Sequence, residues 1–276
     1  MSEIAGPFRV GPFRPVADHT YVATAGFDLE GETGEINVGL VVGTEAALLV
    51  DAGQTAEQGR LLQAAAAEIT ELPVTTVVLT HAHTDHAHGL TGIETTTSIA
   101  HEATRDRLAA DPAAPALPNR VLSLAAAIDL GGGVRVEAVH LGRGHTDGDL
   151  VVVVPDVQVV FAGDLVESAG PPHYGPDSYP HEWPVTLDGL IGLTLNHSIV
   201  IPGHGPAMTR EQVFEQRGRI AAVSGEISRL GSLGVSVDDA ESRAEWALPF
   251  TAIRGGYAAG TTQAKAATPA RHLPMV

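Results

Sequence analysis

The sequence predicts an α/β protein in which two β-sheets pack together and helices cover their outer faces, an αββα sandwich. Three observations predict this class. Short apolar or β-branched runs alternate with helix-like runs, and this pattern occurs twice along the chain. Glycine-rich turns such as residues 31–34 separate the runs. The 276 residues are 44% hydrophobic but only 4% aromatic, so a sizeable core must consist mainly of aliphatic side chains.

The first half of the chain accounts for one sheet and its helices. We expect strands at His19–Ala25, Ile36–Val42, Ala46–Val50 and Val74–Thr80, and helices at Thr55–Ile69 and Glu102–Ala110. Thr55 is suited to cap the first of these helices, whose Ala, Leu and Gln content favours helix. A proline-rich loop is expected at residues 111–119.

The second half repeats the order of strands and then helices. We expect strands at Val121–Leu124, Val134–His140, Leu150–Val154, Val157–Ala162 and Ser198–Ile201, and helices at Pro184–Leu195 and Arg210–Leu230. Residues 169–184 show no periodicity. We expect one domain over residues 1–254, followed by a C-terminal tail or docking segment at 255–276, because that end is rich in small and polar residues.

Charge and composition exclude several classes of protein. A formal net charge of −17 argues against a nucleic-acid groove, and it disfavours docking on anionic lipid. The absence of cysteine excludes disulfides, a thiol nucleophile and thiolate metal ligands. The chain shows no signal-peptide pattern and no run of about 18 apolar residues. We therefore expect a cytoplasmic protein that acts on a small molecule, and the pattern leaves homo-oligomer formation open.

The densest chemical signal is the segment His81-Ala82-His83-Thr84-Asp85-His86. In extended backbone, residues two apart point the same way, so His81 and His83 can hold one ion. Asp85 and His86 follow a turn and can face a second position. Imidazole and carboxylate groups are natural zinc ligands, and they also suit iron or manganese. The alternative, a solvated histidine-rich loop, leaves the matching segments further along unexplained.

Three later segments each place one candidate ligand just beyond an expected strand. They contain His145 in Gly-His-Thr-Asp-Gly, Asp164 after Ala-Gly, and His204 in Pro-Gly-His-Gly. Neighbouring glycines permit close backbone approach at each position. Asp51, in Leu-Leu-Val-Asp-Ala-Gly, also ends an apolar run. It is either an orienting partner of the site or an ordinary turn residue.

Taken in order, these motifs resemble the metallo-β-lactamase superfamily over about residues 20–206. The resemblance implies two metal ions, zinc with manganese or iron as alternatives. It implies His81, His83 and His145 at the first ion and Asp85, His86 and His204 at the second, with Asp164 bridging. Asp51 would orient a ligand or the histidine loop. The acidic residue at 164 is similar to glyoxalase II, lactonases and other two-metal hydrolases of this fold.

The implied activity is zinc-dependent hydrolysis of a small ester, thioester or lactone. A hydroxide bridging the two ions attacks the carbonyl carbon, and Asp85 both ligates and orients it as the catalytic residue. Alternatives within the fold are a β-lactam hydrolase and a phosphodiesterase. An alternative of another class is a non-catalytic metal-binding scaffold.

Other polar and aromatic residues have weaker interpretations. Single histidines at 88, 101, 140 and 197 are either outer partners of the site or ordinary packed and surface residues. The segment 169–184 carries His173, Tyr174, Tyr179, His181 and Trp183. These side chains either wall a substrate pocket or pin a surface loop. Arg210, Arg217 and Arg219 do not match the glutathione-binding pattern of glyoxalase II.

Overall fold

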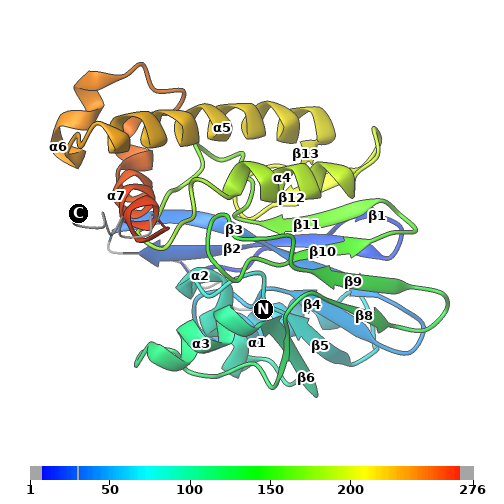
Figure 1. The fold of residues 1–276 in the computed structure, drawn as a ribbon. Coiled ribbons are helices and arrows are strands. Elements are labelled where there is room, and N and C mark those ends of the chain that lie inside the picture. The colour runs from blue at the N-terminus through cyan, green and yellow to red at the C-terminus, as the bar shows by residue number, and fades with distance from the viewer. Residues whose placement is uncertain (1–7, 30, 268–276) are drawn as a thin grey trace, which may run out of the picture.

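The computed structural model describes residues 8–29 and 31–267, which form two β-sheets packed face to face (Figure 1). Helices α4 and α5 cover one outer face, and α1 and α3 lie on the opposite side of the molecule (Figure 1). The αββα sandwich predicted from the sequence is therefore confirmed.

The first sheet has the order β1-β2-β3-β4-β5-β6-β7 and is mixed. Its strands β1 to β4 pair antiparallel, and β4 to β7 pair parallel. Their bounds are β1 Arg14–Ala17, β2 Thr20–Leu29, β3 Glu32–Val42, β4 Ala47–Val50, β5 Val74–Val78, β6 Thr97–His101 and β7 Arg120–Leu122.

The second sheet has the order β13-β12-β11-β10-β9-β8. The pair β11/β12 is parallel and the other pairs are antiparallel. The bounds are β8 Ala125–Asp129, β9 Arg135–Val139, β10 Val151–Val154, β11 Val159–Gly163, β12 Ile199–Pro202 and β13 Met208–Thr209. The parallel pairs place strand carboxyl ends together at one edge of each sheet, which is where ligand sites of such sheets form.

The helices connect and cover these strands. They are α1 Ala56–Ala67, α2 Thr84–Ala87, η1 His88–Gly92, α3 Glu102–Ala110, α4 Trp183–Gly192, α5 Arg210–Ser232, α6 Val237–Ala240, η2 Glu241–Arg243 and α7 Phe250–Ala267. Thr55 caps α1 as predicted, because its hydroxyl accepts from the Gln58 backbone N–H at 3.2 Å. No helix in the described part of the chain is long and apolar enough to cross a lipid bilayer.

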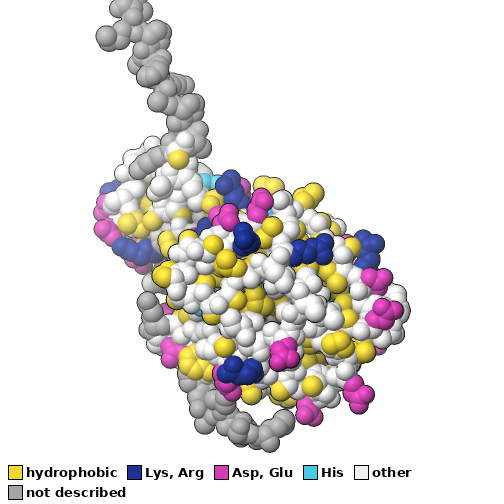
Figure 2. All heavy atoms as spheres, turned by 90° about the horizontal axis from the view of Figure 1, so that it is seen from below, with side chains coloured by type: hydrophobic (Ala, Val, Ile, Leu, Met, Phe, Trp, Pro, Cys, Tyr) yellow, Lys and Arg dark blue, Asp and Glu magenta, His cyan; other side chains and the backbone are white. Residues whose placement is uncertain are grey.

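Three hydrophobic clusters lie between these layers, and β10 shows how they arise. Val152 and Val154 face the core between the sheets, whereas Val151 and Val153 face the core under α4, α5 and α7. Since both faces of the strand are covered, it reads as a continuous apolar run. On the face seen from below, acidic and basic side chains are interspersed among hydrophobic and uncharged ones (Figure 2).

The structure differs from the expected elements in several places. Strands β1, β6, β8 and β13 and helix α7 were not expected. The strand expected at Val121–Leu124 ends two residues early, because β7 ends at Leu122 and the chain then crosses to the second sheet, where β8 begins at Ala125. Helix α7 spans the expected domain boundary at 254, so residues 255–267 belong to a helix whose Ile253 and Tyr257 are buried against α5. The remainder of the expected tail, residues 268–276, lies outside the described residues.

Candidate metal centre

All seven candidate ligands come together at the carboxyl edge of the sheets. They form two groups, and within each group the ligand atoms all lie within 4.8 Å of one another. The first group is His81, His83, His145 and Asp164, and the second is Asp85, His86 and His204. The residues follow β5, β9, β11 and β12 in the chain.

The histidine segment supplies both groups because its backbone changes conformation at His83. His83 is extended, with φ −63° and ψ 148°, and occupies the position just before the short helix α2. His81 and His83 precede the helix and face the first group, whereas Asp85 and His86 lie on its first turn and face the second. The predicted division of this segment between two positions therefore has a local cause.

Asp51 orients two of the histidines from behind. Its Oδ2 accepts a hydrogen bond from His86 Nδ1 at 2.8 Å, and its Oδ1 accepts from the Thr80 N–H at 2.7 Å. The Thr80 hydroxyl donates to Asp51 at 2.9 Å, so its oxygen can accept from His81 Nδ1, 3.1 Å away. Both rings therefore carry their proton on Nδ1 and present Nε2 to the site. The hydrogen bonds of Asp51 to His86 and Thr80 support its role in orienting the two histidine rings.

The other first-group histidines are oriented by the segment after β11. His83 Nε2 donates to Asp177 Oδ2 at 3.2 Å, and His145 Nδ1 donates to the His173 carbonyl at 3.1 Å. These contacts leave His83 Nδ1 and His145 Nε2 as unprotonated ligand atoms, separated by 2.9 Å. His204 completes the pattern, since its Nδ1 donates to the Glu35 carbonyl at 3.1 Å.

The arrangement fits cations because buried ligand atoms converge on one another and several of them have no hydrogen-bond partner. His86 Nε2 lies 3.2 Å from Asp164 Oδ1, and both atoms are buried without a hydrogen-bond partner. His81 Nε2 is also buried without one. Facing electron pairs repel at these distances unless a positive charge lies between them. A divalent ion in each group would satisfy these atoms together.

Asp164 lies between the two groups. Its Oδ2 is 3.4 Å from His145 Nε2 in the first group and 3.3 Å from His204 Nε2 in the second. Its Oδ1 faces His86 Nε2. This position is the one expected for a carboxylate that bridges two ions.

A glycine makes room for this carboxylate. A Cβ on Gly203 would lie 1.7 Å from Asp164 Oδ1, so any larger residue there would displace the acid. The Gly203 carbonyl accepts from the Asn37 N–H at 2.8 Å, and the Asn37 side chain donates to the carbonyls of Pro202 and Gly205. The loop carrying His204 is thereby tied to β3.

Burial and charge shape the electrostatics of the site. Burial alone would raise the pKa of Asp164, but His204, His86 and His81 hold it well below its usual range. Burial lowers the pKa of His145 to about 3. Asp149 lies outside the ligand set, and burial raises its pKa to about 7 although Thr146 donates to it from its backbone and hydroxyl.

The sequence did not reveal Thr80, Asp177 or Arg107 as parts of the site. Arg107 of α3 donates to Asp177 at 3.0 Å and pairs with Asp147, so it fixes the carboxylate that holds His83. Asp177 lies in the aperiodic segment 169–184, where no pattern marks a functional residue. Thr80 directly precedes His81 at the end of a buried run, and that position is the signal that could have found it.

Other residues singled out in the sequence lie elsewhere. His88 pairs with Asp111 at 3.3 Å, His101 and His140 stack with ring centroids 4.0 Å apart, and His197 is exposed. Arg217 pairs with Asp188 of α4 at 2.7 Å. None of these histidines belongs to either ligand group of the described residues.

The pocket-wall interpretation of Tyr174 and Trp183 is wrong. Both side chains are fully buried in the core under α4, α5 and α7. Trp183 donates to the Leu165 carbonyl at 3.1 Å, and its ring packs edge-on against His145. The apolar area that these two side chains bury holds the segment in place. This outcome matches the alternative interpretation, in which the side chains pin a surface loop.

Comparison with known proteins identifies the family. The family model of the metallo-beta-lactamase superfamily matches residues 31–204, and the chain belongs to this superfamily. A metallo-beta-lactamase type 2 from Bacillus sp. (strain 170) is 31% identical over 134 residues, which cover 48% of this chain and 52% of the relative. One from Bacteroides fragilis is 27% identical over 191 residues, covering 68% and 75%. The chain thus spans about half the length of the Bacillus relative it matches.

Solved structures show the same fold. A metallo-beta-lactamase from Pontibacter korlensis superposes with a TM-score of 0.67 at 22% identity, covering 76% of this chain and 98% of that one. One from Erythrobacter litoralis gives 0.65 at 20% identity, covering 76% and 95%.

Proposed function

We propose that the protein is a two-metal hydrolase that cleaves a small ester, thioester or lactone, with zinc as the bound metal. The observation that carries the proposal is the convergence of seven inward-facing ligand atoms in two groups with Asp164 between them. Membership of the superfamily supports a metal-dependent hydrolase.

The chain's own residues would hold and orient the reacting groups. When bound, two zinc ions supply Lewis acidity and a nucleophile derived from water near neutral pH. Asp85, buried beside His86 and His204, would hold the second ion and orient the attacking water. His83 and His204 are the most exposed ligands, with side chains 32% and 12% accessible, so substrate would approach from their side.

The metal ligands have acidic neighbours and no basic side chain beside them. Among the described residues, the ion-pair partners of the seven ligands are the ligands themselves together with Asp51 and Asp177, and no Lys or Arg is among them. Arg107 is committed to two carboxylates. A substrate carboxylate would therefore have only the bound metal ions, and no Lys or Arg side chain, to receive it.

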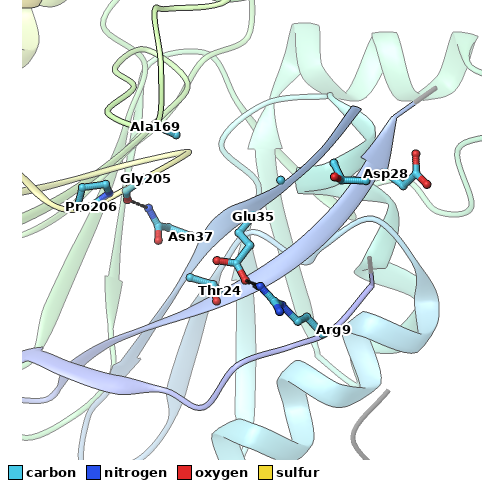
Figure 3. A pocket seen from close by; sticks show the side chains of 10 residues that line it. Arg9, Thr24, Asp28, Glu35, Asn37, Ala169, Gly205 and Pro206 are labelled. Atoms are coloured by element: carbon cyan, nitrogen blue, oxygen red, sulfur yellow. Dashed lines mark hydrogen bonds and ion pairs between the residues drawn. The ribbon is translucent and has the colours of Figure 1, made fainter. Parts of the chain in front are cut away.

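A cavity of about 950 Å³ adjoins the loop that carries His204. It lies between the β2–β3 hairpin and residues 205–206, with Arg9 and Glu35 paired on its wall (Figure 3). Glu35 is also the residue whose carbonyl holds His204. The volume is within the range of small-molecule sites, and we propose that it receives the part of the substrate remote from the reacting carbonyl.

β-Lactam hydrolysis is the second candidate, because the relatives reported above are metallo-beta-lactamases. An acidic residue at 164 is a feature shared with lactonases and glyoxalase II, and no Lys or Arg lies beside the ligands to receive the carboxylate of a β-lactam. For these reasons we place the ester, thioester or lactone first.

The test is a substrate panel with the zinc-loaded protein. It contains p-nitrophenyl acetate, an acetyl thioester, an aliphatic γ-lactone, a chromogenic cephalosporin and bis(p-nitrophenyl) phosphate. We expect turnover of at least one of the first three, at least about a hundredfold loss in His83→Ala, and no loss in the control His197→Ala, whose side chain is exposed. Turnover of the cephalosporin alone would favour the second candidate, and a zinc-loaded protein inert to the panel would favour a scaffold.

A further inference from the structure

Two of the three histidines of the first group depend on one short segment. Residue 173 supplies the carbonyl that holds His145, and Asp177 supplies the carboxylate that holds His83. The partners of the second group, Asp51 and Glu35, lie on other parts of the chain. A displacement of residues 173–177 would therefore act on the first group alone.

This segment rests on the C-terminal helix α7. The Tyr174 N–H donates to the Ala252 carbonyl at 3.1 Å, and Gln263 Nε2 donates to the Ser178 carbonyl at 3.0 Å. His181 Nε2 donates to the Gly260 carbonyl at 3.2 Å. Tyr174 of the segment and residues 178 and 181 just after it therefore all contact one helix.

The packing between helix and segment is tight at the backbone. A Cβ on Gly255 would lie 2.5 Å from the Tyr174 carbonyl oxygen and 3.2 Å from the Gly175 carbonyl carbon. Because the nearest atoms are backbone, a side chain at 255 could be accommodated only if the segment moved.

Helix α7 is itself firmly held. Ile253 and Tyr257 are buried in the core that α7 shares with α5, and the Tyr257 hydroxyl donates to the Val235 carbonyl at 2.9 Å. His181 is also held from α5, since its Nδ1 lies 3.2 Å from the Ser228 hydroxyl. The helix can therefore act as a fixed surface against which the segment is positioned.

We infer that α7 is a positioning element of the first metal site, and that it acts by holding residues 173–177 in place behind His83 and His145. The inference rests on the proposed two-metal function. It gives the C-terminal region a role in the metal centre that the sequence did not indicate.

The experiment measures zinc affinity at each group separately, by competition with a chromophoric chelator. His204→Ala leaves the first group complete, and His83→Ala leaves the second complete. Gly255→Ala is introduced into each background. We expect it to weaken zinc binding by about ten- to hundredfold in the His204→Ala protein, the range for outer partners of metal ligands, and by less than about twofold in the His83→Ala protein.

Two controls separate positioning from general instability. Gly225→Ala adds a methyl group to α5 in open space and should leave both affinities unchanged. Val136→Ala weakens the core between the sheets, where Val136 is fully buried, and should lower the melting temperature without a selective loss at the first group. A cycle with Asp177→Asn should be less than additive with Gly255→Ala, because both act through His83.

The outcomes divide clearly. Equal losses at both groups, or no loss at either, would overturn the inference while leaving the two-metal function standing. A wild-type protein that binds no zinc would overturn the proposed function and this inference with it.

Discussion

Asp51 accepts a hydrogen bond from His86 Nδ1 at 2.8 Å, and this contact decides which nitrogen of His86 faces the metal centre. Asp51 sits just beyond β4 with φ +67°, a left-handed conformation that Asp and Asn tolerate better than most residues. The substitution Asp51→Asn therefore removes the charge while preserving the backbone preference.

We expect Asp51→Asn to weaken zinc binding at the second group by about ten- to hundredfold. The amide cannot accept from Thr80 and His86 on both of its atoms as the carboxylate does. Chelator competition in the His83→Ala background measures this affinity. An unchanged value would show that Asp51 is only a turn residue.

Gly203→Ala should dismantle the bridge between the groups without unfolding the protein. The added Cβ would meet Asp164 Oδ1 at 1.7 Å, so the carboxylate must turn away from one or both ions. We expect bound zinc to fall below two per chain and turnover to drop together with it, as measured by elemental analysis and initial rates. The control is Gly170→Ala, which adds a Cβ into open space nearby. Full zinc content in Gly203→Ala would contradict a bridging Asp164.

Protons should compete with zinc more strongly at the second group than at the first. Burial alone would lower the pKa of His204, but Asp164 and Asp85 raise it to about 9, and carboxylates likewise raise the pKa of His86 well above its usual value. Burial lowers the pKa of His145 to about 3 and that of His81 well below its usual value. A raised pKa means that the metal-free ligand holds a proton at pH 7, which zinc must displace.

Zinc affinity of the second group should therefore rise as pH increases from 7 through about 9, the range in which His204 loses its proton. In the first group only His83 has a raised pKa. Burial alone would lower the pKa of His83, but the carboxylate of Asp177 raises it above its usual value. Calorimetry at pH 7 in two buffers of different ionisation enthalpy counts the protons released. The His83→Ala protein, which retains the second group, should release more than the His204→Ala protein. Equal release by the two would contradict the prediction.

Trp183→Ala should cost stability because Trp183 is a core residue. Its side chain is fully buried and packs against Tyr174 with ring centroids 4.6 Å apart. Truncating a buried Trp typically costs about 3–5 kcal/mol of unfolding free energy. Urea denaturation of the metal-free protein, followed by circular dichroism, measures the change. The matched control Val185→Ala, at an exposed position on α4, should change it by less than about 0.5 kcal/mol. A raised KM with unchanged stability would restore the pocket-wall interpretation.

Local patterns carried much of the fold prediction. Buried runs such as β5 and β10 and the capped helix α1 are visible because their side-chain pattern and caps lie within a few residues of each other. The sequence did not predict helix α7, because the helix is rich in glycine and small residues, which by themselves indicate a tail. Packing against α5 and the segment after β11 overrides that weak propensity.

The sequence by itself determined the candidate ligands, because residue type and a position just beyond an apolar strand are local properties. It could not determine which nitrogen of each histidine faces the centre. That choice depends on Asp51, Asp177 and the carbonyls of Glu35 and His173, which come from distant parts of the chain. Only the tertiary structure decided these contacts, since a hydrogen bond between segments remote in sequence exists only after the sheets and helices have packed together.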